Sequence, residues 1–179
     1  MPHPQLDRSR VEMTPLAERA NRVCIDRDRI PPERPPSRTP DADQARVLAA
    51  AVDRIRAAIK DGRPVVLAFG AHAIKNGLAP VLIALLREGW VSHLATNGAG
   101  IIHDWELAFQ GETSEDVRAN IADGRFGNWA ETGYYLNLAI NIGAWEGKGY
   151  GEAVGALVHE GGLEIPSPAT LRTAVADAD

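Results

Sequence analysis

The chain has 179 residues, of which 45% are hydrophobic and 24% charged, so its composition is that of a globular protein and excludes a disordered or fibrous chain. Its 19 basic and 24 acidic side chains give a formal net charge of −5, which argues against a nucleic acid or an anionic membrane as partner, because both attract positive charge. The single cysteine, Cys24, excludes an intrachain disulfide framework and a multi-cysteine zinc site, and we expect a cytoplasmic protein.

Residues 1–40 are polar and contain five prolines between positions 31 and 40. Proline lacks an amide donor and disfavours the helical conformation of the residue before it. We therefore predict an N-terminal arm over residues 1–40, either extended over a surface or subunit or disordered, and a packed domain over residues 41–179.

The domain begins with an amphipathic helix. Apolar side chains recur at three- and four-residue spacing from Val47 to Ile59, and charged side chains fill the other face. Asp41 is the predicted N-cap and Gly62 the predicted stop.

Two successive units follow, each consisting of a strand, a glycine turn and a helix. Residues 64–69 and 91–96 are short apolar runs that predict strands buried on both faces. Each run leads through a small-residue turn into a predicted helix, over residues 74–88 and 101–110. This alternation predicts a parallel sheet with right-handed crossovers and flanking helices, an α/β fold.

The remainder of the chain reads as helical. Thr113–Asp116 resembles a helix start, residues 124–128 a loop, and helices are predicted over 129–145, over 150–159 and after Ser167. Two clear strands are few, because stable sheets normally have more. We therefore expect an incomplete domain: weak strands hide in the second half, the chain belongs to a longer one, or a partner supplies the rest.

The two glycine turns are the candidate binding site, because ligands of open α/β sheets bind beyond the carboxyl ends of the strands. Small residues let backbone approach a ligand, and a following helix favours phosphate at its first amides. The candidate residues for binding a dinucleotide cofactor are Gly70, Ala71, His72, Lys75, Asn97, Gly98, Ala99 and Gly100.

The segment from Gly98 to His103 resembles the dinucleotide fingerprint G-x-G-x-x-G, with histidine in place of the last glycine. The acidic ribose ligand expected about 20 residues later is not found at the end of a recognisable strand. The alternative is a tight turn that binds no ligand.

His103 and Asp104 are the candidate catalytic residues. An imidazole titrates near neutral pH, so His103 is suited to act as general acid or base, with Asp104 orienting it. Alternatively, acidic residues lie there because the helix dipole favours them. A metal site formed by His72, His103, Asp104 and Glu106 is also conceivable, although it lacks a diagnostic spacing.

Lys75 lies one helical turn after His72, so both can face one pocket. A buried lysine there is suited to contact a phosphate or to act as a nucleophile. The alternative is an exposed residue at a helix start.

Together the two turns resemble the NAD-binding half of the deoxyhypusine synthase family over roughly residues 45–140. Residues 70–77 stand where that family has T-S-N-x-x-S-S-G, residues 97–104 where it has T-A-G-G-V-E-E-D, and residues 125–128 where it has R-I-G-N. The segment from His103 to Glu106 also resembles the related NAD-dependent archaeal-type ornithine cyclodeaminases.

The resemblance implies a Rossmann-like fold, bound NAD, and homo-oligomers with sites at their interfaces. It places Ala71, His72, Lys75, Asn97, Gly98 and Ala99 along the nucleotide. His103 replaces a family glutamate near the polyamine, which makes spermidine a doubtful substrate because histidine attracts a cationic amine less. The family's catalytic lysine lies in a C-terminal half that the sequence does not contain, so we expect a truncated member.

Three functions follow as hypotheses. The first is an NAD-dependent transferase or deaminase that oxidises a C–N bond of an amine or amino acid transiently. The second is a catalytically inactive NAD-binding or assembly module, and the third a metal-dependent hydrolase that uses His72 and His103.

Overall fold

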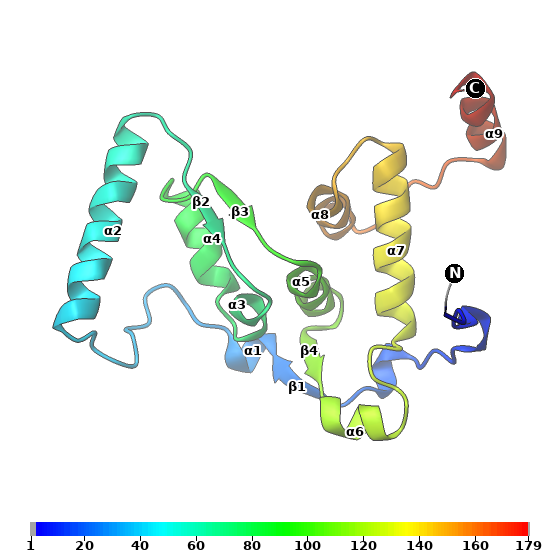
Figure 1. Cartoon of the computed structure of the whole chain (residues 1–179), viewed down its shortest axis with the longest axis horizontal. Helices are drawn as coiled ribbons and strands as arrows, with labels where there is room; N and C mark the ends of the chain where they lie inside the picture. Colours follow the sequence, from blue (N-terminus) through cyan, green and yellow to red (C-terminus); the bar gives the residue numbers. More distant parts are fainter. Residues whose placement is uncertain (1–2, 179) are drawn as a thin grey trace. The chain divides into compact units, whose positions relative to one another are not determined.

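The computed structural model describes residues 3–178, which form two compact units (Figure 1). Residues 20–116 form one, here called the sheet unit, and the residues up to 19 together with those from 117 on form the other, the helical unit. The predicted arm, residues 1–40, is therefore divided between the two units. The domain boundary predicted after residue 40 falls inside the sheet unit, whereas the two units divide after residues 19 and 116.

The sheet unit contains the predicted parallel pair. Strands β2 (Val66–Ala68) and β3 (His93–Ala95) run parallel, with Leu67 opposite Leu94. The chain is thus a mixed α/β protein. Burial on both faces was a wrong expectation, because Val66 is 58% exposed and neither three-residue strand contains a buried residue.

Three helices pack with these strands: α3 (His72–Lys75), α4 (Ala79–Arg87) and α5 (Gly98–Gln110). Their common core consists of Ile74, Leu82 and Leu107, with Leu67, Phe69, Ala79 and Leu94 against them. The single helix predicted over residues 74–88 is wrong, because Gly77 adopts a left-handed φ of 83° and separates α3 from α4. The fixed φ of proline suits Pro80, in the first turn of α4.

A second sheet connects the predicted arm to the end of α5. Strand β1 (Asn21–Cys24), which continues into α1 (Ile25–Asp28), pairs antiparallel with β4 (Glu112–Glu115). The helix start predicted at Thr113 is therefore wrong, and α6 (Val117–Ala122) begins only after it. Hydrogen bonds to β1, distant in sequence, outweigh the local capping pattern here.

Helix α2 (Ala42–Lys60) confirms the amphipathic helix predicted after Asp41. The Asp41 carboxylate accepts a hydrogen bond from the Gln44 amide at 2.8 Å, and the Gln44 side chain accepts one from the Asp41 amide at 3.2 Å. This reciprocal pair satisfies amides that the first turn of a helix leaves without partners. Gly62, with a φ of 67°, follows the helix end as predicted.

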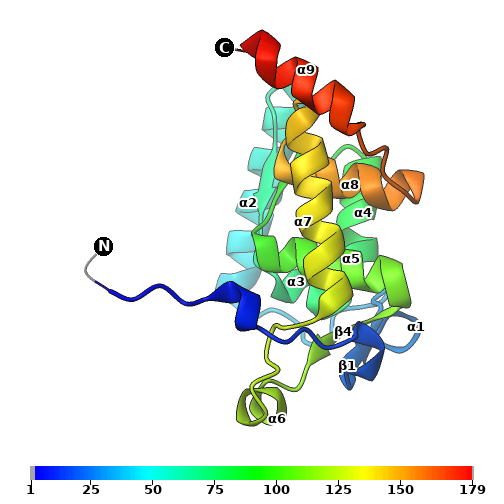
Figure 2. The same ribbon diagram turned by 90° about the vertical axis from the view of Figure 1, so that its right-hand side faces the viewer.

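The helical unit confirms the predicted C-terminal helices as α7 (Ala130–Trp145), α8 (Tyr150–Glu160) and α9 (Pro168–Ala178). Figure 2 shows α8 running across α7, and a Cβ at Gly143 would collide with Ala153, so a glycine is needed for this close approach. Short turns η1 (Arg8–Arg10) and η2 (Leu16–Glu18) precede the strand β1 in the chain.

The start of α7 is held by the N-terminal residues of the same unit. The Thr14 carbonyl accepts a hydrogen bond from the Ala130 amide at 2.8 Å, and the Leu16 amide donates to the Glu131 carboxylate at 2.6 Å. Leu16 is 1% exposed, so it is a core residue. Within residues 3–178, no helix combines the length and apolar character needed to cross a membrane.

Candidate functional site

The parallel pairing of β2 and β3 brings the two predicted turns to the same edge of the sheet. Ala68 lies opposite Ala95, so Gly70 and Asn97 each follow their strand by two residues at equivalent heights. In parallel sheets this carboxyl edge is where ligands bind. The eight candidate cofactor-binding residues therefore come from two neighbouring turns, as the sequence predicted.

The first turn is exposed to solvent, and few atoms pack against its tip. Gly70 is exposed, and no atom lies within 4 Å of the position that a Cβ there would take. His72 is exposed, whereas Ala71 and Lys75 are half-buried. The helix α3 that follows has only four residues, so its dipole is weak and the phosphate-binding role expected of a long helix does not apply to it.

The second turn is built more firmly. The Asn97 side chain accepts a hydrogen bond from the Gly100 amide at 3.0 Å and so caps the 13-residue helix α5. A Cβ on Gly100 would collide with the Thr96 side chain, which explains why glycine is needed at this position on packing grounds alone. The first amides of α5, at Gly98 and Ala99, point away from the helix body and favour an anion.

His103 lies on α5, half-buried, within hydrogen-bond distance of a strand residue. Its Nδ1 atom is 2.8 Å from the Thr113 hydroxyl, and that hydroxyl donates to the Glu106 carboxylate at 2.5 Å. Thr113 and Glu106 are 0% and 1% exposed. The three side chains thus form a chain of hydrogen bonds that leads from a buried carboxylate to an imidazole.

The hydrogen bond from Thr113 to Glu106 indicates which tautomer a neutral His103 ring adopts. A hydroxyl has one proton, and Thr113 gives it to Glu106, so the Thr113 oxygen accepts from His103. The proton of neutral His103 is therefore on Nδ1, and Nε2 is the atom that carries the lone pair. A histidine in this state can take up a proton at Nε2, with a carboxylate behind it to stabilise the positive charge.

The sequence predicts His103 as a catalytic residue and Asp104 as the group that orients its ring. The structure brings Thr113 and Glu106 to His103 instead. Asp104 is an exposed residue by surface area, but the atoms packed around its carboxyl partly exclude water from it, and this desolvation raises its pKa. Glu106 was detectable at three-residue spacing from His103. Thr113 was not, because its position depends on the pairing of β4 with β1.

A cavity of about 390 Å³ in the sheet unit lies away from the two turns. Ile59, Pro64, Val65 and Ser92 are among the residues that line it, so it is at the amino ends of β2 and β3. This is the opposite edge from the glycine turns. The cavity is therefore not part of the predicted cofactor site.

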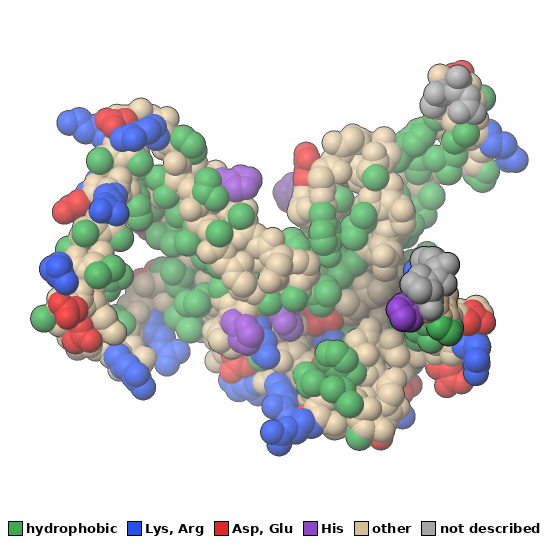
Figure 3. All heavy atoms as spheres, viewed as in Figure 1, with side chains coloured by type: hydrophobic (Ala, Val, Ile, Leu, Met, Phe, Trp, Pro, Cys, Tyr) green, Lys and Arg blue, Asp and Glu red, His purple; other side chains and the backbone are tan. Residues whose placement is uncertain are grey.

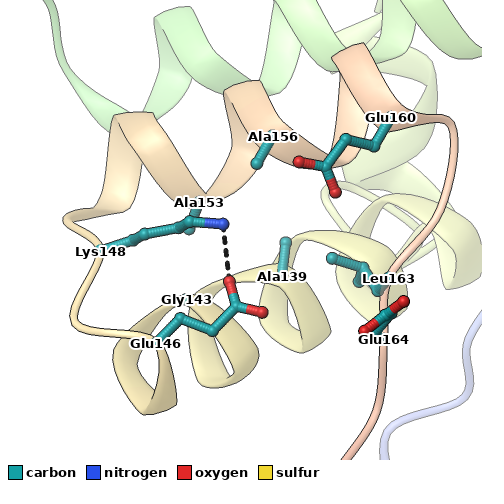
Figure 4. A pocket seen from close by; sticks show the side chains of 9 residues that line it. All are labelled: Ala139, Gly143, Glu146, Lys148, Ala153, Ala156, Glu160, Leu163 and Glu164. Atoms are coloured by element: carbon teal, nitrogen blue, oxygen red, sulfur yellow. Dashed lines mark ion pairs between the residues drawn. The ribbon is translucent and has the colours of Figure 1, made fainter.

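The helical unit contains another cavity, of about 190 Å³, between α7 and α8 (Figure 4). Glu146, Glu160 and Glu164 line it, and Lys148 forms an ion pair with Glu146 at 2.7 Å. The hydrogen bond to Glu146 and the negative charges nearby raise the pKa of Lys148. None of these residues was predicted from the sequence. Three of the four charged residues that line the cavity are acidic, and the other lining residues are small or apolar.

The residues of the hypothetical metal site are not gathered in one place. Among residues 3–178, no group of three or more histidine, cysteine, aspartate or glutamate side chains is arranged to hold a metal ion. Within the described residues, His72 and His103 therefore do not form the metal site that a hydrolase would need.

Comparisons with known proteins give no family assignment: no family model, no curated protein and no solved structure matches the chain.

Proposed function

We propose that the chain is a deoxyhypusine-synthase-like, NAD-binding protein with a Rossmann-like arrangement of its parallel strands, and that it oxidises the C–N bond of an amine or amino acid. The observation that carries the proposal is the parallel pairing of β2 and β3, which brings both glycine turns to one carboxyl edge. A dinucleotide has two phosphates and two sugars, and two adjacent turns suit its length.

Each turn offers a different contact to such a cofactor. The open space beside Gly70 lets a ligand approach the backbone, and Lys75 supplies a positive charge for a phosphate. At the second turn the amides of Gly98 and Ala99 are oriented for a pyrophosphate oxygen, because Asn97 caps the next amide instead.

The chemistry that NAD supplies when bound is the acceptance of a hydride from the carbon that bears the nitrogen. In the proposed reaction, His103 takes the proton that leaves the nitrogen, at its Nε2 atom. The amine thereby becomes an imine, which a second amine captures or water hydrolyses. Thr113 and Glu106 orient His103 and stabilise its positive charge, a role that we assign to them in place of Asp104.

Isothermal titration calorimetry with NAD tests the cofactor. We expect binding with a dissociation constant below about 1 mM, and at least a tenfold loss in Gly70→Leu, because the added side chain would fill the space that the ligand needs. Gly155→Leu is the matched control, since Gly155 is also exposed and its Cβ position also meets open space, but it lies on α8. Absence of binding to the wild type, or equal binding by Gly70→Leu, would refute the proposed site.

A catalytically inactive assembly module is the second candidate, and the exposed apolar side of α2 favours it. The two candidates differ at His103. If the protein is an enzyme, His103→Ala abolishes amine-dependent reduction of NAD, measured by absorbance. If it is an assembly module, the wild type shows no such reduction with any amine or amino acid tested, and His103→Ala leaves its oligomeric state unchanged.

A further inference from the structure

Helix α2 presents an apolar stripe that the described part of the chain does not bury. The stripe consists of Val47, Leu48, Ala51, Val52, Ile55, Ala58 and Ile59. Val47 and Leu48 are 64% and 57% exposed, and no residue of α2 is buried within residues 3–178. The C-terminal part of the stripe is covered in part, because Ile55 and Ala58 are half-buried and Ile59 lines the cavity beside Val65. Figure 1 shows α2 as a separate rod at one side of the sheet unit, and Figure 3 shows hydrophobic side chains among the charged ones over it.

Such a stripe needs a cover. Most of the stability of a helix in a protein comes from packing its apolar face, so aliphatic side chains left in water forgo that stabilisation. The helix is nevertheless well formed locally, with a capping box at Asp41 and an ion pair between Asp43 and Arg46 at 3.2 Å. These local contacts hold α2 in shape but do not bury its stripe.

The charges of α2 are divided between its two halves. Residues 41–50 carry two aspartates and one arginine, a net charge of −1, whereas residues 51–60 carry one aspartate, two arginines and one lysine, a net charge of +2. Two copies of α2 side by side in opposite directions would place each acidic half beside a basic half. The two helix dipoles would then also be antiparallel.

We propose that a second copy of this chain docks on α2, so that the two α2 helices form an antiparallel, two-fold symmetric pair. A two-fold interface uses the same surface on both copies, which the stripe and the charge division both permit. The proposal does not depend on NAD binding, because α2 does not contribute to either glycine turn.

The spacing of the stripe indicates the register. A two-fold axis between residues 53 and 54 places Leu48 of one copy opposite Ile59 of the other, and Val52 opposite Ile55. Two such layers occur on each side of the axis, at a helix separation of about 8–10 Å. One pair of helices buries less than the usual 1,200–2,000 Å² or so of a stable interface, so we expect a dissociation constant of about 1–100 μM.

Sedimentation velocity over a concentration range of about 1–200 μM tests this interface. We expect a monomer–dimer equilibrium in the wild type and at least a tenfold weaker dimer in Val52→Asp, because the new carboxylates would face apolar side chains. Ala50→Asp is the matched control, since it makes the same charge change on the opposite, exposed side of α2 and should leave the equilibrium unchanged. Circular dichroism checks that both variants keep their helices.

The direction of the pair is tested by spin labels on Lys60→Cys in a Cys24→Ser background. In the antiparallel register the two labelled positions are about 20 Å apart along the helix axis, whereas parallel helices would leave them about 10 Å apart. A monomer at all concentrations, a dimer that Val52→Asp does not weaken, or the shorter distance would each overturn the proposal. So would a monomer whose stripe binds anionic lipid vesicles, since the occupant would then be a membrane.

Discussion

The two strand-to-helix turns of the parallel pair share a sequence pattern but are held in different ways. The second turn is fixed at its tip, by the Asn97 cap and by the contact of Gly100 with Thr96, and a 13-residue helix follows it. The first turn has open space beside Gly70 at its tip. Its close packing lies after the four-residue helix α3, where Gly77 contacts the backbone of Asp28. Glycine is therefore required for packing at one turn tip and not at the other, although both were predicted to serve a ligand.

The largest effect is expected at Gly77. A Cβ there would collide with the backbone of Asp28, and the left-handed φ of 83° disfavours any other residue. We expect Gly77→Ala to lower the free energy of unfolding by about 3–5 kcal/mol, because strain and overlap add. Urea unfolding followed by tryptophan fluorescence measures the loss.

Gly70→Ala is the control for this prediction, since its Cβ would meet open space. It should change the free energy of unfolding by less than about 1 kcal/mol and in the stabilising direction, because alanine restricts the unfolded chain. Equal losses in the free energy of unfolding for Gly70→Ala and Gly77→Ala would show that the tip of the first turn is also closely packed.

The next largest effect is expected at Thr113, which supports His103 on the helix of the second turn. Thr113→Val keeps the shape of the side chain but removes the hydroxyl between His103 and the buried Glu106. We expect a loss of about 2–3 kcal/mol in the free energy of unfolding, because a buried charged group loses a hydrogen bond. Thr173→Val, on the exposed side of α9, should change it by less than about 0.5 kcal/mol.

Nitrogen NMR of the His103 ring separates an orienting role of Thr113 from a merely structural one. The wild type should show the proton of the neutral ring on Nδ1, and Thr113→Val should shift the balance toward Nε2. A wild-type ring protonated on Nε2 would contradict the direction of the hydrogen bonds from Glu106 to His103.

Features encoded by neighbouring residues could be predicted from the sequence. The capping box of Asp41 and Gln44 lies within four residues, and the α2 and α7 helices follow from the spacing of their apolar side chains. The parallel pairing followed from the alternation of strands, glycine turns and helices. These features brought both turns and His103 into the candidate site without knowledge of the structure.

Features that depend on distant residues could not be predicted. Thr113 was assigned to a helix because Thr113–Asp116 resembles a cap, whereas it pairs with Val23, 90 positions away, in a strand. The break at Gly77 depends on the chain that passes at Asp28. The exposure of Val66 depends on how many strands the sheet has, which a short apolar run does not specify.

A smaller effect is expected at Gly100, where two contributions oppose each other. Alanine gains up to about 1 kcal/mol over glycine inside a helix, but its Cβ would overlap the Thr96 side chain at a cost of about 1–3 kcal/mol. We expect a net loss of about 1 kcal/mol in Gly100→Ala. In a Thr96→Ala background the same change should become neutral or stabilising, and unfolding of the four proteins of this cycle measures the difference. A loss unaffected by Thr96→Ala would show that the tip of the second turn is not fixed by this contact.

The smallest effect is expected at Asp104, on the exposed side of the same helix. Partial desolvation by the surrounding atoms raises the pKa of its carboxyl in the folded state, so the folded protein holds this proton to a higher pH than the unfolded chain does. The free energy of unfolding therefore decreases as the pH rises through the unfolded and then the folded pKa of this group. Asp104→Asn has no carboxyl to titrate at this position, so its melting temperature should match that of the wild type near pH 3 and exceed it slightly at pH 7. Asp104→Glu, which retains a carboxyl, should follow the wild type. A wild type favoured over Asp104→Asn at pH 7 would instead place a compensating positive charge beside Asp104 and return it to the site as a partner of His103.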